Sequence, residues 1–179
     1  MQVRAFRAGV KAGPSRRVSE PHQRSDGLRV LLQRVSRASV RVAGRTVGSI
    51  ERGLLVFVGV EHGDGEREVR YYADKTAELR IFPDTLGKMN LSVEDTAGAV
   101  LVVSQFTLAG STRKGRRPSY TRAAEPARAE PIYESFVARL RRRGLRVACG
   151  TFQAMMEVEL INDGPVTILL EALDPGAPA

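Results

Sequence analysis

The stretch GLLVFVGV, residues 53–60, carries the plainest structural signal in this chain. Its apolar residues run on without alternating with polar ones, which is typical of a strand buried on both faces of a sheet. The stretch AVLVVSQFTL, residues 99–108, predicts a second strand of the same kind. A length of 179 residues corresponds to one domain of ordinary size, with or without a tail.

Weaker patterns surround these two strands. Period-two and apolar runs predict further strands, with a hairpin turn at Ala43-Gly44, and helical spacing of apolar residues predicts two helices. The predicted strands are 29–35, 38–50 (a hairpin), 154–162 and 166–171, and the predicted helices are 65–79 and 129–144. Two helices cannot supply every connection between six or seven strands. Hairpins must supply several, so we expect an α+β domain.

The net charge of +8 is unevenly distributed. Residues 1–27 hold six basic and two acidic residues, with two prolines and little to bury, so we expect them to be disordered. An organelle transit peptide has a similar composition. We favour a start codon placed too far upstream, with the domain spanning residues 28–174 and a flexible tail at 175–179. The body is only mildly basic, which indicates a polyanionic partner weakly.

Composition narrows the classes of function. No apolar run approaches the length of a membrane span, so we expect no membrane contact. The single cysteine, Cys149, excludes an intramolecular disulfide and fits a reducing compartment; we expect a buried thiol and a cytoplasmic protein. His22 and His62 have no partner at ligand spacing, so we expect neither a metal nor a cofactor. His62 lies in a glycine-rich loop, where a solvated side chain is expected more than a general base.

Three stretches remain as candidates for chemistry. In SQFTL, polar residues Ser104, Gln105 and Thr107 interrupt an apolar strand near its end, where side chains reach a cleft; simple fraying of the strand explains the pattern equally well. STRKGRRPSY, residues 111–120, is a flexible basic loop of the kind that contacts phosphates, or a merely solvated one. Its basic residues are Arg113, Lys114, Arg116 and Arg117.

The third stretch is NDGPVT, residues 162–167, between two predicted strands. Proline has no N–H to give to a sheet, so Gly164-Pro165 is out of place inside a strand. The pattern alone favours an ordinary trans turn between two strands. The alternative is a cis bond, since X-Pro is the one place where cis is inexpensive, and such a turn would point two carbonyl groups in one direction.

These stretches resemble the D-aminoacyl-tRNA deacylase family. The resemblance runs from about Leu28 to Glu171 and is carried by LLQRVSRASVRV, LRIFPDTLGKMNLSV, VLVVSQFTL, KGRRPSY and INDGPVT, in the family's order. It implies a mixed, largely antiparallel, barrel-like sheet with two helices, in a homodimer whose active sites lie at the interface. It also implies hydrolysis of the ester between a D-amino acid and tRNA, with glycyl-tRNA mischarged on tRNA-Ala as a further substrate.

The resemblance assigns the site residue by residue. Catalysis falls to Ser104, Gln105, Phe106 and Thr107 of one subunit. A cis Gly164-Pro165 comes from the partner subunit, with Arg34 orienting that turn. Met156 stands at a methionine of the family's pocket, whereas Gln153 and Met155 depart from the small and acidic residues usual there, which puts the pocket's shape in doubt.

The residues themselves suit this chemistry. An aminoacyl ester is already activated, so positioning a water and stabilising an oxyanion can suffice without histidine, cysteine or metal. Backbone N–H groups near Phe106 and Thr107 are candidate oxyanion donors, and the Thr107 hydroxyl a candidate for orienting water. A covalent role for Ser104 is disfavoured, because no activating base is visible. The competing hypotheses are a non-catalytic tRNA-binding or other nucleic-acid-binding module, and a serine hydrolase of small esters.

Overall fold

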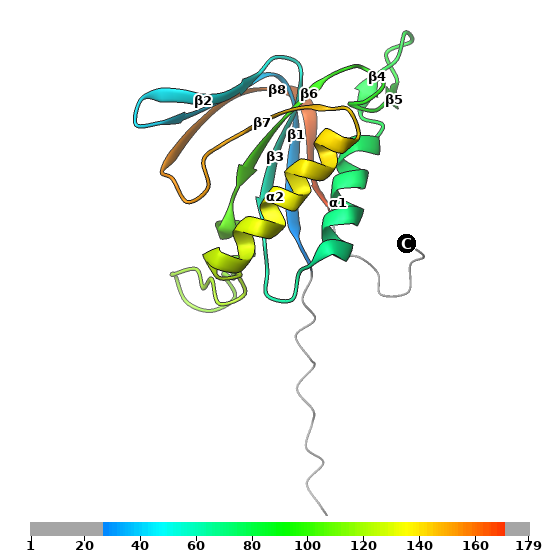
Figure 1. Ribbon diagram of the computed structural model, residues 1–179. Coiled ribbons are helices and arrows are strands. Elements are labelled where there is room, and N and C mark those ends of the chain that lie inside the picture. Colours follow the sequence, from blue (N-terminus) through cyan, green and yellow to red (C-terminus); the bar gives the residue numbers. More distant parts are fainter. Residues whose placement is uncertain (1–26, 171–179) are drawn as a thin grey trace, which may run out of the picture.

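The structure is a computed structural model that describes residues 27–170 (Figure 1). The predicted extension 1–27, apart from Gly27, and the predicted tail 175–179 lie outside the described residues. The elements are, in chain order, β1 (Arg29–Val42), β2 (Arg45–Ile50), β3 (Gly53–Gly59), α1 (Glu66–Glu78), β4 (Phe82–Pro83), β5 (Met89–Leu91), β6 (Ala99–Ser104), the 3-10 helix η1 (Phe106–Ala109), α2 (Pro126–Arg142), β7 (Arg146–Cys149) and β8 (Met156–Leu170).

The long strand β1 organises the main sheet. Along one edge it pairs antiparallel with β3 through its first half and with β2 through its second half; along the other edge it pairs antiparallel with β8. Strand β3 then pairs parallel with β6, and β6 parallel with β7. The sheet curls until β2 approaches β7, where a Cβ on Gly48 would lie 2.4 Å from the carbonyl oxygen of Cys149. The predicted α+β class, with a mixed, largely antiparallel and barrel-like sheet, is confirmed.

Both helices pack on one face of this sheet, as Figure 1 shows. The predicted apolar stripes are the buried ones: α1 buries Val69, Tyr72 and Ala77, and α2 buries Phe136 and Leu140. These side chains form the larger core with the near face of β1, β3 and β6. A second, smaller core fills the concave side of the sheet, from Val35 and Leu101 to the partly buried residues of β8. Because β3 and β6 carry apolar residues toward both cores, their sequences read as continuous apolar runs.

Several element boundaries differ from those predicted. The strand predicted at 99–108 ends at Ser104, because η1 begins at Phe106. Helix α2 begins at Pro126, three residues earlier than predicted, since proline fits the first turn of a helix. The short strands β4, β5 and β7 are not predicted from the sequence; each is too short to show an alternating pattern.

The predicted pair of strands around Gly164-Pro165 is wrong. Residues 156–170 form one strand, β8, and both halves pair with β1. The prediction fails because proline breaks a strand only where its missing N–H is needed in the ladder, and here the ladder skips these residues.

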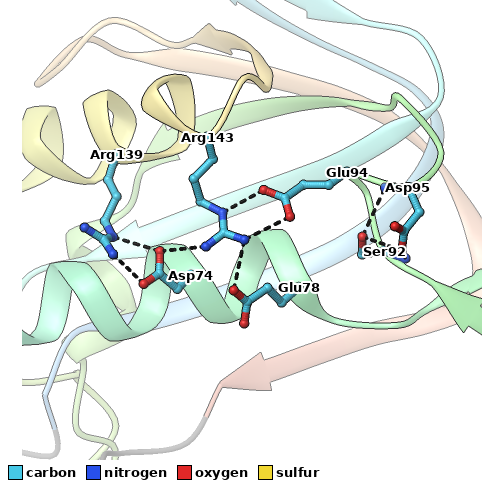
Figure 2. Close-up of polar contacts among 7 residues, drawn as sticks. All are labelled: Asp74, Glu78, Ser92, Glu94, Asp95, Arg139 and Arg143. Atoms are coloured by element: carbon cyan, nitrogen blue, oxygen red, sulfur yellow. Dashed lines mark hydrogen bonds and ion pairs between the residues drawn. The ribbon is translucent and has the colours of Figure 1, made fainter. Parts of the chain in front are cut away.

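An ion-pair network joins the two helices (Figure 2). Arg139 of α2 meets Asp74 of α1 at 2.5 Å, and Arg143, just beyond α2, meets Asp74, Glu78 and Glu94 at 3.2, 2.9 and 2.6 Å. The Arg139 and Arg143 guanidinium groups lower the pKa of Asp74. These side chains are a quarter or more exposed, so their contribution to stability is modest. They fix the position of α2 relative to α1 and to the loop that carries Glu94.

Candidate active site

A cleft of about 590 Å³ opens beyond the end of β6. Its walls come from the ends of β3 and β6, from the segment 120–126 with the first turns of α2, and from residues 152–158 at the start of β8. Most of the lining is apolar. The lining residues are Val58, Val60, Val103, Ser104, Gln105, Phe106, Tyr120, Ala123, Ala124, Glu125, Pro126, Ala129, Tyr133, Phe152, Gln153, Ala154, Met155, Met156 and Val158.

Three residues of the predicted catalytic stretch, Ser104, Gln105 and Phe106, line this cleft, whereas Thr107 is exposed just beyond the lining. Ser104 is the last residue of β6, and Gln105 stays attached to the sheet because its N–H donates to the carbonyl of Val58 at 2.8 Å. The backbone then turns into η1. Gly59 makes this turn possible: a Cβ there would lie 2.7 Å from the carbonyl oxygen of Gln105, closer than real Cβ atoms come. Fraying of the strand therefore does not describe this stretch, since its backbone is held against β3.

Phe106 and Thr107 of this stretch are exposed, and Ser104 and Gln105 are partly buried. Gln105 Nε2 donates to the Thr107 hydroxyl oxygen, which leaves the hydroxyl hydrogen of Thr107 available. Phe106 is 58% exposed and packs edge-on against Tyr120, with ring centroids 5.2 Å apart. Phe106 and Thr107 are the first two residues of η1, and backbone N–H groups at the start of a helix have no partner within it.

The Gly164-Pro165 peptide bond is cis. The resemblance implies a cis bond, whereas the sequence pattern alone favours an ordinary trans turn. In the β1–β8 ladder, Gln33 faces Thr167 and Val35 faces Asn162, so Arg34 alone stands opposite residues 163–166. These four residues bulge out of the sheet. Gly164 and Pro165 are both exposed, and neither lines the cleft of its own chain.

Arg34 and Asn162 hold this bulge from both sides. The buried Arg34 side chain forms an ion pair with Asp163 at 2.9 Å and donates to the Gly164 carbonyl at 3.4 Å and to the Ile81 carbonyl. The Asn162 amide donates to the carbonyls of Arg34 and Val166 at 2.9 and 3.1 Å. Arg34 thus contacts the turn that it is predicted to orient, and the contacts of Asn162 and Asp163 are not predicted. The polar run NDG inside an apolar strand was the available signal.

The basic loop leads directly into the cleft wall. Backbone hydrogen bonds between Ser111 and Ser119 close the loop at its base, and all four of its cationic side chains are exposed. The next residue, Tyr120, lines the cleft. The loop therefore places positive charge at the edge of the cleft rather than inside it.

Residues 152–156 form the opposite wall. Met156 lines the cleft, as expected for a pocket residue. Gln153 has a φ of 59°, in the left-handed region that favours glycine. Met155 is 91% exposed at the cleft edge. Both departures from the family pattern are therefore part of the cleft surface.

The other titratable side chains are poorly placed to act as a general base or a nucleophile. His62 is exposed in its loop, as expected. Cys149 is half-buried rather than fully buried, and burial raises the pKa of its thiol, which opposes a role as nucleophile. Tyr133 lines the cleft but donates to the Val102 carbonyl at 2.9 Å, and burial raises its pKa strongly. Within residues 27–170, no group of three or more His, Cys, Asp or Glu side chains is placed to hold a metal ion. No helix in that range could cross a membrane.

Comparison with known proteins decides what this arrangement is. The family model described as D-Tyr-tRNA(Tyr) deacylase matches residues 31–171. The chain belongs to the D-aminoacyl-tRNA deacylase family. The resemblance found in the sequence and the expected enzyme class, a hydrolase that removes an acyl group, are confirmed.

Relatives of this family match the chain over nearly their whole length. A D-aminoacyl-tRNA deacylase of Koribacter versatilis is 62% identical over 145 residues, which is 81% of this chain and 97% of the relative. The deacylase of Halalkalibacterium halodurans is 54% identical, over 81% of this chain and 99% of the relative.

Solved structures share the deacylase fold. One is described as c-Myc DNA Unwinding Element Binding Protein, with a TM-score of 0.77 and 39% identity over 82% of this chain and 99% of the other. A second, a probable eukaryotic D-amino acid tRNA deacylase, has a TM-score of 0.72 at 19% identity, over 80% and 98% of the two chains, and supports the fold alone.

Proposed function

We propose that this chain hydrolyses the ester bond of D-aminoacyl-tRNA, releasing the free D-amino acid and the tRNA. One observation carries the proposal: in a chain of this family, Ser104, Gln105 and Phe106 line an apolar cleft, the exposed Thr107 follows them directly, and the cleft wall continues into the basic loop. The catalytic domain is residues 28–174, and the single cysteine fits work in the cytoplasm.

The chemistry needs little beyond positioning. The ester carbonyl lies over the start of η1, where the N–H groups of Phe106 and Thr107 stabilise the oxyanion that forms when water attacks. The Thr107 hydroxyl, held by Gln105, orients the water. The electron pair of the broken C–O bond goes to the ribose oxygen of the tRNA, which takes up a proton. The neighbouring ribose hydroxyl is a candidate for assisting this transfer.

Selection for the D-form belongs to the Gly164-Pro165 turn of a partner subunit in a homodimer. In support, the turn is exposed, is held rigidly by Arg34, and is absent from the lining of its own chain's cleft. The Gly164 and Pro165 carbonyls hold the substrate's α-ammonium group. An L side chain then strikes the turn, whereas a D side chain points to solvent. Glycine has no side chain to exclude, so glycyl-tRNA mischarged on tRNA-Ala is also a substrate.

The basic loop binds the tRNA. Arg113, Lys114, Arg116 and Arg117 are exposed beside the cleft, where they contact phosphates near the acceptor end without reading sequence. Met156 closes the pocket on the far side. Neither a metal nor another cofactor is part of this mechanism.

A non-catalytic nucleic-acid-binding module is the second candidate. One observation favours it: a structure 39% identical to this chain is described as a DNA unwinding element binding protein. The same basic loop would serve such binding. This alternative predicts binding without ester cleavage and assigns no part to Gly164-Pro165.

One experiment separates these functions. Ester loss from D-tyrosyl-tRNA and L-tyrosyl-tRNA is followed side by side with the full chain, with and without EDTA. Rapid loss of the D-form alone, unaffected by EDTA, is the expected result. Equal, slow loss of both forms would refute the deacylase and leave the binding module to be tested by filter binding of uncharged tRNA.

A further inference from the structure

Glu61 lies two residues beyond the end of β3 and carries a charge in an unusual place. Its side chain is 2% exposed, and charged side chains are rarely buried unless they are paired. Its Oε1 accepts from Arg29 Nε at 2.9 Å and forms an ion pair with Arg122 Nη2 at 3.5 Å. These two arginines come from the start of β1 and from the segment 120–126. One buried oxygen atom therefore connects three parts of the chain.

The backbone around Glu61 makes the same connection. Glu61 and Ala123 form an antiparallel bridge. On either side of it, the His62 N–H donates to the Arg122 carbonyl, and the Ala124 N–H donates to the Val60 carbonyl, both at 2.9 Å. The segment 120–126 is thus attached to the end of β3 by a pair of backbone hydrogen bonds and by the ion pair of Arg122.

That segment is the wall of the cleft. Tyr120, Ala123, Ala124, Glu125 and Pro126 all line it, and Tyr120 also packs edge-on against Phe106. Tyr120 is also the last residue of the basic loop and follows Ser119, which closes the loop against Ser111. A shift of the segment would therefore move the aromatic pair at the cleft mouth and the base of the basic loop together.

We propose that Glu61 is a positioning residue for substrate binding: through Arg122 it holds the wall 120–126 against β3, and so fixes Tyr120 and the cleft mouth. The proposal rests on the proposed function for its substrate. Glu61 does not touch the reacting atoms, and apolar side chains in place of Glu61 and its two arginines together would fill the site without the cost of burying charges. A positioning role predicts a change in substrate binding that a purely structural role does not.

The test uses Glu61→Gln and Arg122→Gln in the full chain, with Glu94→Gln as the matched control. Glu94 also pairs with an arginine, Arg143 at 2.6 Å, but Arg143 lies just beyond α2 and not in the wall 120–126. For Glu61→Gln and Arg122→Gln, KM for D-tyrosyl-tRNA is expected to rise about tenfold, as for one lost charge-assisted hydrogen bond, with kcat nearly unchanged. Amide hydrogen exchange at His62 and Ala124 is expected to accelerate. The control should change neither quantity.

The double variant completes the test. If Glu61 and Arg122 act as one unit, Glu61→Gln/Arg122→Gln should raise KM no further than the more severe single variant. An unchanged KM, a loss in kcat alone, or additive effects of the two substitutions would each overturn the proposal. If Glu61→Gln fails to fold, Arg122→Gln decides, because Glu61 then keeps its contact with Arg29.

Failure of the proposed function would be visible separately. If the wild-type chain hydrolyses no D-tyrosyl-tRNA, the same variants are compared by hydrogen exchange at Ala124 and by their Kd for uncharged tRNA. Faster exchange with weaker binding would support Glu61 as the positioning residue of a binding cleft. Unchanged values of both would overturn it.

Discussion

At the scale of single residues, Thr107 and Ser104 are close in sequence but differ in what they can do. Thr107 is exposed, and its hydroxyl oxygen already accepts from Gln105, so its direction is set. Ser104 is half-buried at the end of β6, and the residues beside it include no general base. Hydroxyl groups without a base are weak nucleophiles, so the geometry favours Thr107 as an orienting group over Ser104 as a covalent one.

Substitution of the two hydroxyl residues tests this distinction. Thr107→Ala is expected to lower kcat on D-tyrosyl-tRNA about 100-fold, the usual effect of removing one group that stabilises or orients the reacting centre. Ser104→Ala should keep most of the activity, and a serine-reactive phosphonate should not label the wild-type chain. Labelling at Ser104, together with complete loss of activity in Ser104→Ala, would instead establish the serine hydrolase mechanism.

Asp64 should make stability depend on pH. It is 3% exposed, and burial raises its pKa to about 6, with Glu68 and Glu61 adding to the rise and the hydrogen bond from the Glu61 N–H and the charge of Arg29 opposing it. A raised pKa means that the folded state holds the proton more tightly. The stabilisation is fully present below about pH 4, the unfolded value, and is lost as pH rises through about 6.

The variant Asp64→Asn isolates this effect. Relative to wild type, its free energy of unfolding should increase between about pH 4 and pH 7 and then stay level, by at most about 3 kcal/mol, since one pKa unit corresponds to about 1.4 kcal/mol. Urea unfolding at a series of pH values measures the difference. A difference that is constant with pH would show that Asp64 titrates as it does in the unfolded chain.

At the scale of elements, the site depends on how closely η1 packs against β3. Gly59 permits this contact, because a Cβ there would lie 2.7 Å from the Gln105 carbonyl oxygen and 3.0 Å from the Leu108 side chain. The backbone of Gln105 cannot yield easily, since its N–H is bonded to β3. A side chain at 59 must therefore displace the catalytic stretch itself.

Gly59→Ala is accordingly expected to lower kcat at least tenfold and to cost about 1–3 kcal/mol of stability through overpacking. Initial rates and urea midpoints measure the two effects. Gly65→Ala is the matched control, because Gly65 has extended backbone and its nearest neighbour to a new Cβ lies 3.9 Å away. Full activity in a folded Gly59→Ala protein would show that η1 can shift without consequence.

At the scale of the whole molecule, the cleft and the Gly164-Pro165 turn belong to different places on one chain. The proposed homodimer brings them together, since a two-fold dimer presents the same surface of each subunit to the other. A Cβ at Gly164 would meet only the Asn162 side chain, at 3.9 Å. Gly164→Trp should therefore fold normally and block the cleft of its partner rather than its own.

Mixing two inactive proteins tests this arrangement. Thr107→Ala and Gly164→Trp homodimers should each be nearly inactive. After the subunits are exchanged, mixed dimers carry one intact site and one doubly altered site, so about one quarter of wild-type activity should return. Absence of recovery, with mixed dimers demonstrated by mass spectrometry, would place both features in the site of a single chain.

The sequence by itself determined the elements whose signal is local and repeated. The apolar runs of β3 and β6 and the stripes of α1 and α2 are visible because each element buries a face along its whole length. The motif SQFTL marked the stretch proposed to be catalytic, and the resemblance marked the family. Tertiary structure alone decided that β8 continues through Pro165, because β1 pairs with both halves and Arg34 supports the bulge between them. It also placed Tyr120 at the cleft and Glu61 behind the segment that lines it. Their roles depend on contacts between residues far apart in the chain, such as Glu61 with Arg122, which no local pattern records.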